Sequence, residues 1–209
     1  MNENNNTLVV IFGSGGHSQV LINSLNSMGR KILGIVDPVL EGQKNFLSIP
    51  VIKESDFLEN KISEEFEVVN GVGKMPGNNN REILSRKLRK ANYKLATIID
   101  SNACIASNVE IDEGAQIMAG AVIQPNVKIG QDSIINTSSS VDHDCRIGKN
   151  CHIAPGVTMS GNVLIGDNCH IGTGSIILND IVIYDNCIIA GGSTVFEDMP
   201  PNTKLIQKK

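Results

Sequence analysis

The chain has 209 residues, of which 41% are hydrophobic and 3% aromatic, and its formal net charge is −4 at pH 7. Because the chain is mildly acidic and no stripe of Lys and Arg follows its repeats, we do not expect a nucleic-acid partner. The longest apolar stretch, residues 8–12, is far too short to span a bilayer, and no charged leader precedes it. We therefore expect a cytoplasmic protein with no membrane partner.

The first hundred residues predict a small α/β domain. The apolar run 8–12 is followed at once by a turn that contains Gly13, Gly15, Gly16 and His17, and then by apolar residues at helical spacing. A second apolar run, 32–36, ends at Asp37, whose carboxylate could accept hydrogen bonds from a ribose or a base. This pattern favours binding of a mononucleotide diphosphate, and a purely structural glycine turn is the alternative.

A third strand is expected at 66–72, closing on Gly73, with a helix at about 80–91. The order β, α, β, then β, α predicts a small parallel sheet. Basic residues of the last helix interleave with apolar ones, which is typical of a solvated helix face. Arg81 is the one basic residue near enough to Gly73 in sequence to be considered for a ligand.

An apolar residue then returns at every sixth position without an insertion. The members of this column are Ile105, Ile111, Ile117, Ile123, Ile129, Ile135, Val141, Ile147, Ile153, Met159, Ile165, Ile171, Ile177, Ile183, Ile189 and Val195. A second column of mostly small residues precedes it by two positions. Two inward columns at period six predict a β-helix in which each hexad supplies a short strand and a corner.

Two residue types repeat within the hexads. Asn returns at one position, which marks a repeated bend because Asn tolerates the left-handed backbone conformation. Cys145, Cys151, Cys169 and Cys187 all fall in the small inward column, where a buried thiol is expected to act as a compact apolar filler. We therefore expect neither disulfides nor a metal site from these cysteines.

The histidines lie outside the inward columns. His143 is expected near a turn and is flanked by Asp142 and Asp144, so it is a candidate general base, with a solvated histidine as the alternative. His152 and His170 are separated by three hexads. If three hexads make one coil, these two rings stack on one outer face.

These segments together resemble a family of bacterial sugar acetyltransferases that includes sialic-acid O-acetyltransferases and N-acetyltransferases of nucleotide-linked amino sugars. The resemblance covers both domains and is carried by these segments: residues 12–17, the loop 71–81, Asn136-Thr137-Ser138, Val141-Asp142-His143-Asp144-Cys145 and Ala190-Gly191-Gly192. It implies a Rossmann-like nucleotide-sugar-binding domain at 1–95 and a left-handed parallel β-helix acetyltransferase domain at 96–209. It also implies a homotrimer with active sites between subunits.

The resemblance further implies roles for individual residues. His143 would be the base that deprotonates the sugar amine or hydroxyl as it attacks acetyl-CoA, and Asp144 would hold and polarise it. The acetyl-CoA site would include His152, Gly161, Thr173 and Gly191. The nucleotide sugar would meet Gly13, Gly15, Gly16 and His17 at its diphosphate, Asp37 at its base, and Gly73 on the opposite wall. No metal is expected, and the product would enter bacterial surface glycans.

Three alternatives to N-acetylation remain open. A sialic-acid-like sugar acetylated on oxygen would use the same chemistry without a nucleotide. A zinc hydratase on a similar solenoid needs three His ligands, and the spacing of His143, His152 and His170 disfavours it. A trimeric scaffold or nucleotide-sugar sensor would bind its ligand without turnover.

Overall fold

The computed structural model describes residues 7–58 and 65–206. By its internal contacts the chain divides into two compact units. The first takes the described residues as far as Gly73 together with Asn79–Ala96, and the second takes Lys74–Asn78 together with the described residues from Thr97 onward. The short loop Lys74–Asn78 therefore belongs to the second unit although most of its sequence neighbours belong to the first.

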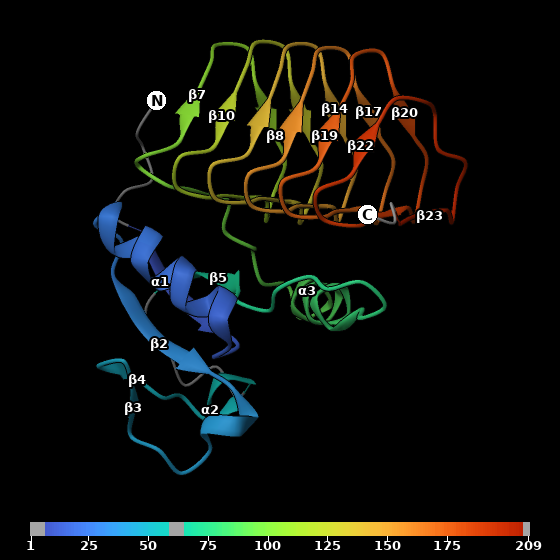
Figure 1. The fold of residues 1–209 in the computed structure, drawn as a ribbon. Helices are drawn as coiled ribbons and strands as arrows, with labels where there is room; N and C mark the ends of the chain where they lie inside the picture. Colours follow the sequence, from blue (N-terminus) through green and yellow to red (C-terminus); the bar gives the residue numbers. More distant parts are fainter. Residues whose placement is uncertain (1–6, 59–64, 207–209) are drawn as a thin grey trace. The chain divides into compact units, whose positions relative to one another are not determined.

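The first unit contains a parallel three-stranded sheet (Figure 1). Its order is β2 (Ile32–Val36), β1 (Leu8–Phe12), β5 (Phe66–Asn70), and its main helices are α1 (Gly16–Ser27) and α3 (Asn80–Lys90). This confirms the predicted small parallel sheet. At the end of strand β5, the Asn70 side chain accepts from the amide of Val72 and donates to Ser85 Oγ on α3.

Four short elements between β2 and β5 were not predicted. They are the 3₁₀ helix η1 (Pro38–Leu40), strands β3 (Asn45–Phe46) and β4 (Ile49–Pro50), and helix α2 (Glu54–Leu58). Each is too short to show a hydrophobic period in the sequence. Asp37 caps η1, since its Oδ1 accepts from the amide of Val39 at 2.9 Å.

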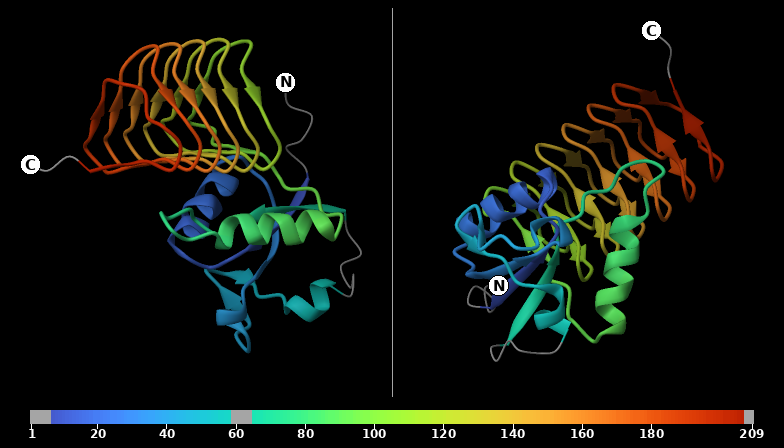
Figure 2. Two further views of the ribbon diagram at one scale, coloured as in Figure 1. Left: turned by 90° about the vertical axis from the view of Figure 1, so that its right-hand side faces the viewer. Right: turned by 90° about the horizontal axis from the view of Figure 1, so that it is seen from below.

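The second unit is a parallel β-helix of two-residue strands, shown from three sides in Figures 1 and 2. One sheet contains β7 (Cys104–Ile105), β10 (Val122–Ile123), β13 (Ser140–Val141), β16 (Thr158–Met159), β19 (Ile176–Ile177) and β22 (Thr194–Val195). A second contains β8 (Glu110–Ile111), β11 (Lys128–Ile129), β14 (Arg146–Ile147), β17 (Leu164–Ile165) and β20 (Val182–Ile183). The third contains β6 (Ile98–Ile99), β9 (Gln116–Ile117), β12 (Ile134–Ile135), β15 (His152–Ile153), β18 (His170–Ile171), β21 (Ile188–Ile189) and β23 (Lys204–Leu205).

Three hexads make one coil, as the pairing of His152 with His170 shows directly. The apolar column is buried from Ile117 to Val195, while Ile105 and Ile111 are partly buried against it at one end. Asn126 and Asn162 have positive φ values of 64° and 59°, which confirms that the repeated Asn marks a left-handed bend. The period-six prediction therefore holds along the whole solenoid.

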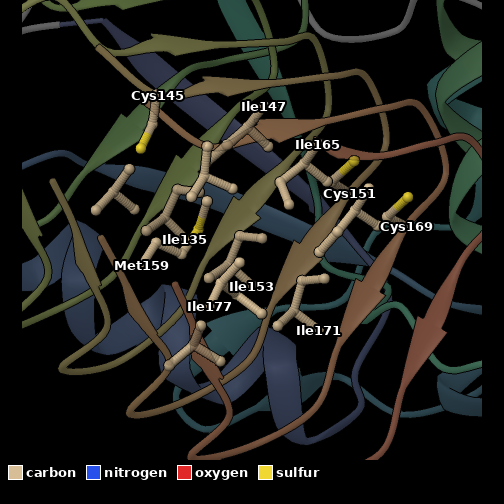
Figure 3. Packing of buried hydrophobic residues seen from close by; sticks show 14 of the residues in the cluster. Ile135, Cys145, Ile147, Cys151, Ile153, Met159, Ile165, Cys169, Ile171 and Ile177 are labelled. Carbon is tan, nitrogen blue, oxygen red and sulfur yellow. The ribbon is translucent and has the colours of Figure 1, made fainter. Parts of the chain in front are cut away.

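The inward cysteines are buried as predicted, but they are more than apolar filler. Figure 3 shows the side chains of Cys151 and Cys169 near one another in the interior, with Cys145 at a separate place. The thiol of Cys151 donates to the carbonyl of Gly166 at 3.0 Å, and that of Cys169 donates to Tyr184 at 3.1 Å. Ser133 makes the same kind of contact in this column, from its Oγ to the carbonyl of Gly148 at 2.7 Å. These donors satisfy corner carbonyls that face the interior.

No helix in the described part of the chain is long and apolar enough to cross a membrane.

Candidate active site

His143 lies on a corner of the solenoid between β13 and β14. The next residue, Asp144, has a φ of 62°, a left-handed conformation that Asp adopts more readily than most residues. The Asp144 amide donates to the carbonyl of Pro125 on the preceding coil at 3.1 Å, which holds the bend in place. The bend leaves the His143 side chain 59% exposed and therefore accessible to a substrate.

His143 and Asp144 form a hydrogen-bonded pair, with 2.7 Å between Nδ1 and Oδ2. The bond to Asp144, and the charges of Asp142 and Asp144, raise the pKa of His143 above its ordinary value. The same bond, together with one from Asn126, lowers the pKa of Asp144. Neutral His143 therefore carries its proton on Nδ1 and presents the lone pair of Nε2, which is the form that a general base needs.

Gly161, predicted for the acetyl-CoA site, lies directly against the His143 ring. A Cβ added to Gly161 would be 2.6 Å from Cε1 of His143 and 2.7 Å from its Nε2. Real Cβ atoms essentially never come so close, so any larger residue would displace the imidazole. The absence of a side chain at this position therefore gives the imidazole its place on the corner.

Asp144 also lines a groove of about 530 Å³. Its lining residues are Asn108, Glu110, Asn126, Lys128, Asp144, Arg146 and Asn162. Lys128 forms an ion pair with Glu110 at 2.6 Å, so part of its positive charge is already compensated. The groove gives solutes access to the Asp144 side of the pair.

His152 lies on a different part of the solenoid, in β15, where its ring is held from three sides. Its Nδ1 is 2.9 Å from the carbonyl oxygen of Lys74, and its Nε2 is 3.0 Å from Nδ2 of Asn136. Since the carbonyl can only accept and the amide nitrogen can only donate, these bonds assign the proton of neutral His152 to Nδ1. The ring also meets that of His170 edge to face, with 5.0 Å between their centroids.

Thr173 and Gly191, also predicted for the acetyl-CoA site, meet on another corner. The Gly192 amide donates to the carbonyl of Thr173 at 2.8 Å, and a Cβ added to Gly191 would be 3.1 Å from that carbonyl oxygen. Within one chain, then, the structure brings His143, Asp144 and Gly161 together and Thr173 and Gly191 together, on separate corners.

In the first unit, the glycines of the turn differ in what the fold requires of them. Gly13 has a φ of 105°, and a Cβ added to it would be 3.3 Å from the backbone of Gly71. Around Gly15 and Gly16, by contrast, no described atom would lie within 4 Å of an added Cβ, and neither has a positive φ. The fold therefore explains glycine at Gly13 but not at Gly15 or Gly16.

The other predicted residues of this unit lie around the same turn. A Cβ on Gly73 would be 3.3 Å from Cβ of His17, so this loop does face the start of α1. Asp37 is engaged within the protein: its Oδ2 accepts from both the amide and the hydroxyl of Ser14, each at 2.7 Å. A ribose or base would have to share this carboxylate with the turn.

Arg81, the basic residue considered for a ligand, is 1% exposed and holds the backbone instead. Its Nη1 donates to the carbonyls of Asn70 and Val72 at 3.0 Å and 2.8 Å.

The sequence did not predict the contacts that Asn126, Asn136, Ser14 and Lys74 make with the candidate site residues. The Asn126 contact could have been found, because Asn126 stands one coil of 18 residues before Asp144.

Among the described residues, no group of three or more His, Cys, Asp or Glu side chains is placed to hold a metal ion.

Family comparisons match both units. Residues 8–88 match the PglD N-terminal domain, and residues 126–161 and 162–197 match the bacterial transferase hexapeptide family of six repeats. A comparison with curated proteins gives no match.

Solved structures match almost the whole chain. A variant of perosamine N-acetyltransferase from Caulobacter crescentus, in complex with CoA and GDP-perosamine, is 30% identical over 94% of this chain and 91% of that chain, with a TM-score of 0.85. The acetyltransferase domain of PglB from Neisseria gonorrhoeae FA1090, in complex with acetyl coenzyme A, is 27% identical over 95% of each chain, with a TM-score of 0.85. WeeI from Acinetobacter baumannii AYE is 25% identical over 96% of this chain and 97% of that chain, also with a TM-score of 0.85.

Proposed function

This chain belongs to the bacterial sugar acetyltransferases with hexapeptide repeats, and we propose that it transfers the acetyl group of acetyl-CoA to the amino group of a nucleotide-linked amino sugar. The observation that carries this proposal is the pairing of an exposed His143 with Asp144 at 2.7 Å on a corner of the solenoid. The complexes of the Caulobacter enzyme with CoA and GDP-perosamine support the choice of substrates.

In the proposed reaction His143 acts as the general base. The sugar amine attacks the thioester carbonyl carbon, and its proton passes to Nε2 of His143 as the carbon–nitrogen bond forms. The positive charge that develops on the ring is stabilised by Asp144, which accepts from Nδ1. The carbon–sulfur bond then breaks, and the thiolate of CoA takes the proton from His143, so that the base is regenerated.

We propose that acetyl-CoA binds between two subunits of a homotrimer. Within one chain Gly161 lies with His143, whereas Thr173 and Gly191 lie on a separate corner. In a groove between subunits, the corner with His143 and Gly161 of one chain would face the corner with Thr173 and Gly191 of its neighbour. His152 would contact the cofactor with its ring held in place by the carbonyl of Lys74 and the side-chain amide of Asn136.

We propose that the first unit binds the nucleotide diphosphate at the start of α1. Gly15 and Gly16 are exposed, no side chain caps α1, and the first amides of a helix are a favourable place for an anion. A ligand that approaches the backbone closely would explain glycine at both positions. His17 and Gly73 would border the diphosphate, and Asp37 would hold the turn through Ser14 while sharing its carboxylate with the nucleoside.

The test is thiol release from acetyl-CoA by the purified protein, with UDP- and GDP-linked 4-amino sugars and free sialic acid as parallel acceptors. We expect turnover with a nucleotide-linked amino sugar, reduced on the order of 10² to 10⁴-fold in His143→Ala. Turnover with sialic acid alone would instead indicate O-acetylation of a free sugar. Nucleotide-sugar binding without turnover would indicate a sensor or scaffold.

A further inference from the structure

The Asp144 carboxylate has a separate protein donor on each oxygen. Oδ2 accepts from Nδ1 of His143 at 2.7 Å, and Oδ1 accepts from Nδ2 of Asn126 at 3.0 Å. Asn126 lies one coil earlier, where the neighbouring strands β11 and β14 are paired in register. The amide that reaches Asp144 therefore comes from a backbone that the solenoid already holds.

We propose that Asn126 is a positioning residue for the reaction: its side-chain amide orients the Asp144 carboxylate, which in turn keeps the proton of neutral His143 on Nδ1. This inference rests on the proposed function, because it assigns Asn126 to the general base of that reaction.

A second donor is needed here because the pair is exposed. The Asp144 side chain is 51% exposed, so water competes for its oxygens and the carboxylate would otherwise turn freely. A hydrogen bond to Oδ1 restricts that rotation and leaves Oδ2 facing His143. The neutral histidine side chain in water prefers its proton on Nε2, which would remove the lone pair that accepts the substrate's proton. A correctly oriented carboxylate reverses that preference.

The neighbouring charges do not replace this contact. Asp142 acts on His143 through its charge, and its Oδ1 accepts from the backbone amide of His143 rather than from the ring. Lys128, Glu110 and Arg146 line the groove with Asp144, and Lys128 is paired with Glu110. Among the described residues, Asn126 and His143 are the side chains whose hydrogen bonds lower the pKa of Asp144.

The solenoid repeats the hydrogen bond from Asn to Asp at a place where no histidine stands beside the Asp. Asn162 donates to Oδ1 of Asp180 at 2.8 Å, again one coil apart, but the residue before Asp180 is Asn179. The donation from Asn to Asp is thus a property of this corner column. It gains a chemical role at Asp144 because His143 stands beside that carboxylate.

The test compares Asn126→Gly with Asn186→Gly. Both asparagines have left-handed backbones, with φ of 64° and 60°, which glycine keeps, and both donate across coils, Asn186 to Oδ1 of Asn202 at 3.1 Å. We expect Asn126→Gly to lower kcat roughly fivefold to tenfold without changing KM for acetyl-CoA. This fold-change corresponds to the loss of the one hydrogen bond that orients Asp144. In ¹⁵N NMR spectra of the full chain, the fraction of neutral His143 with its proton on Nδ1 should fall. Asn186→Gly should change neither.

A second variant guards against a general loss of stability. Asn126→Asp is isosteric and tolerates the left-handed bend, as Asp144 itself does, but it replaces the N–H donor with a carboxylate that repels the Asp144 carboxylate at neutral pH. It should shift the His143 tautomer in the same direction as Asn126→Gly. An unchanged tautomer and kcat in Asn126→Gly, or an equal loss in Asn186→Gly, would overturn the proposal. If the wild-type chain transfers no acetyl group, the proposed function fails, while the tautomer measurement still decides whether Asn126 positions Asp144.

Discussion

The two units offer their candidate functional groups in opposite ways. In the solenoid the group is a side chain, His143, carried on a corner whose left-handed backbone recurs every 18 residues and is hydrogen-bonded to the coils on either side. In the α/β unit the group is the backbone itself, at Gly15 and Gly16, where side chains are absent and no described atom fills the space. The comparison teaches that the proposed function makes opposite demands on the two units: it needs a side chain to be present in the solenoid and side chains to be absent in the turn of the α/β unit.

The sharpest way to break this comparison is to add a side chain in the solenoid, by Gly161→Ala. The new Cβ would come within 2.6 Å of the His143 ring, so the ring must move while the backbone is unaffected. Because misplacement of a catalytic group by about 1 Å can cost on the order of 10²-fold, we expect kcat to fall by about that factor. The thermal midpoint should change little, since the obstructed group is an exposed side chain. Wild-type kcat in Gly161→Ala would mean that the ring does not work from this position.

The next effect in size is the pH dependence set by Asp144. The proposed general base accepts a proton only as neutral His143, so we expect the rate to rise as the pH rises through the pKa of His143, which Asp144 and Asp142 hold above its ordinary value. Asp144→Asn removes the largest cause of that shift. We expect its pH–rate profile to have a midpoint at lower pH and a maximal kcat lower by roughly tenfold, because the Nδ1 tautomer is no longer favoured. A midpoint that does not move would show that another group controls the profile.

In the α/β unit the matched pair is Gly16→Ala and Gly13→Ala. Gly16 has open space around an added Cβ, so alanine should leave stability unchanged but raise KM for the nucleotide sugar several-fold by obstructing the approach to the helix amides. Gly13 has a φ of 105°, so alanine there should cost about 1–3 kcal/mol of unfolding free energy. Thermal melts and KM values of both variants check this. An unchanged KM in Gly16→Ala would favour a purely structural turn.

Much of the fold could be predicted because its signals are periodic. The hexads alone placed the inward columns, the left-handed Asn corners and the stacking of His152 on His170. The segment between β2 and β5 could not be predicted, since its strands β3 and β4 are two residues each and carry no period. Within the solenoid, 18-residue spacing is enough to find contacts between coils once the coil length is known.

The candidate site was harder to predict from the sequence than the fold, for a physical reason. Its contacts depend on where individual side-chain atoms point, which the position of a residue in the sequence does not give. Arg81 stood near Gly73 in sequence, yet its guanidinium turns inward to the carbonyls of Asn70 and Val72. Asp37 ends a strand as a nucleotide-binding acid would, yet its carboxylate holds Ser14. Sequence position indicates the neighbourhood of a side chain, whereas its partners depend on rotamers and on competing acceptors.

The smallest expected effect tests whether the solenoid interior is purely apolar. If the Cys151 thiol were only filler, Cys151→Ala should be better tolerated than Cys151→Ser, because a buried hydroxyl without a partner is costly. The thiol instead donates to the carbonyl of Gly166, and Ser133 shows that a hydroxyl makes the same contact in this column at 2.7 Å. We therefore expect the reverse order in chemical denaturation, with Cys151→Ser close to wild type and Cys151→Ala less stable by about 1 kcal/mol. If alanine proves the more stable of the two, the inward column stabilises the coils through packing alone, and its hydrogen bonds merely accompany that packing.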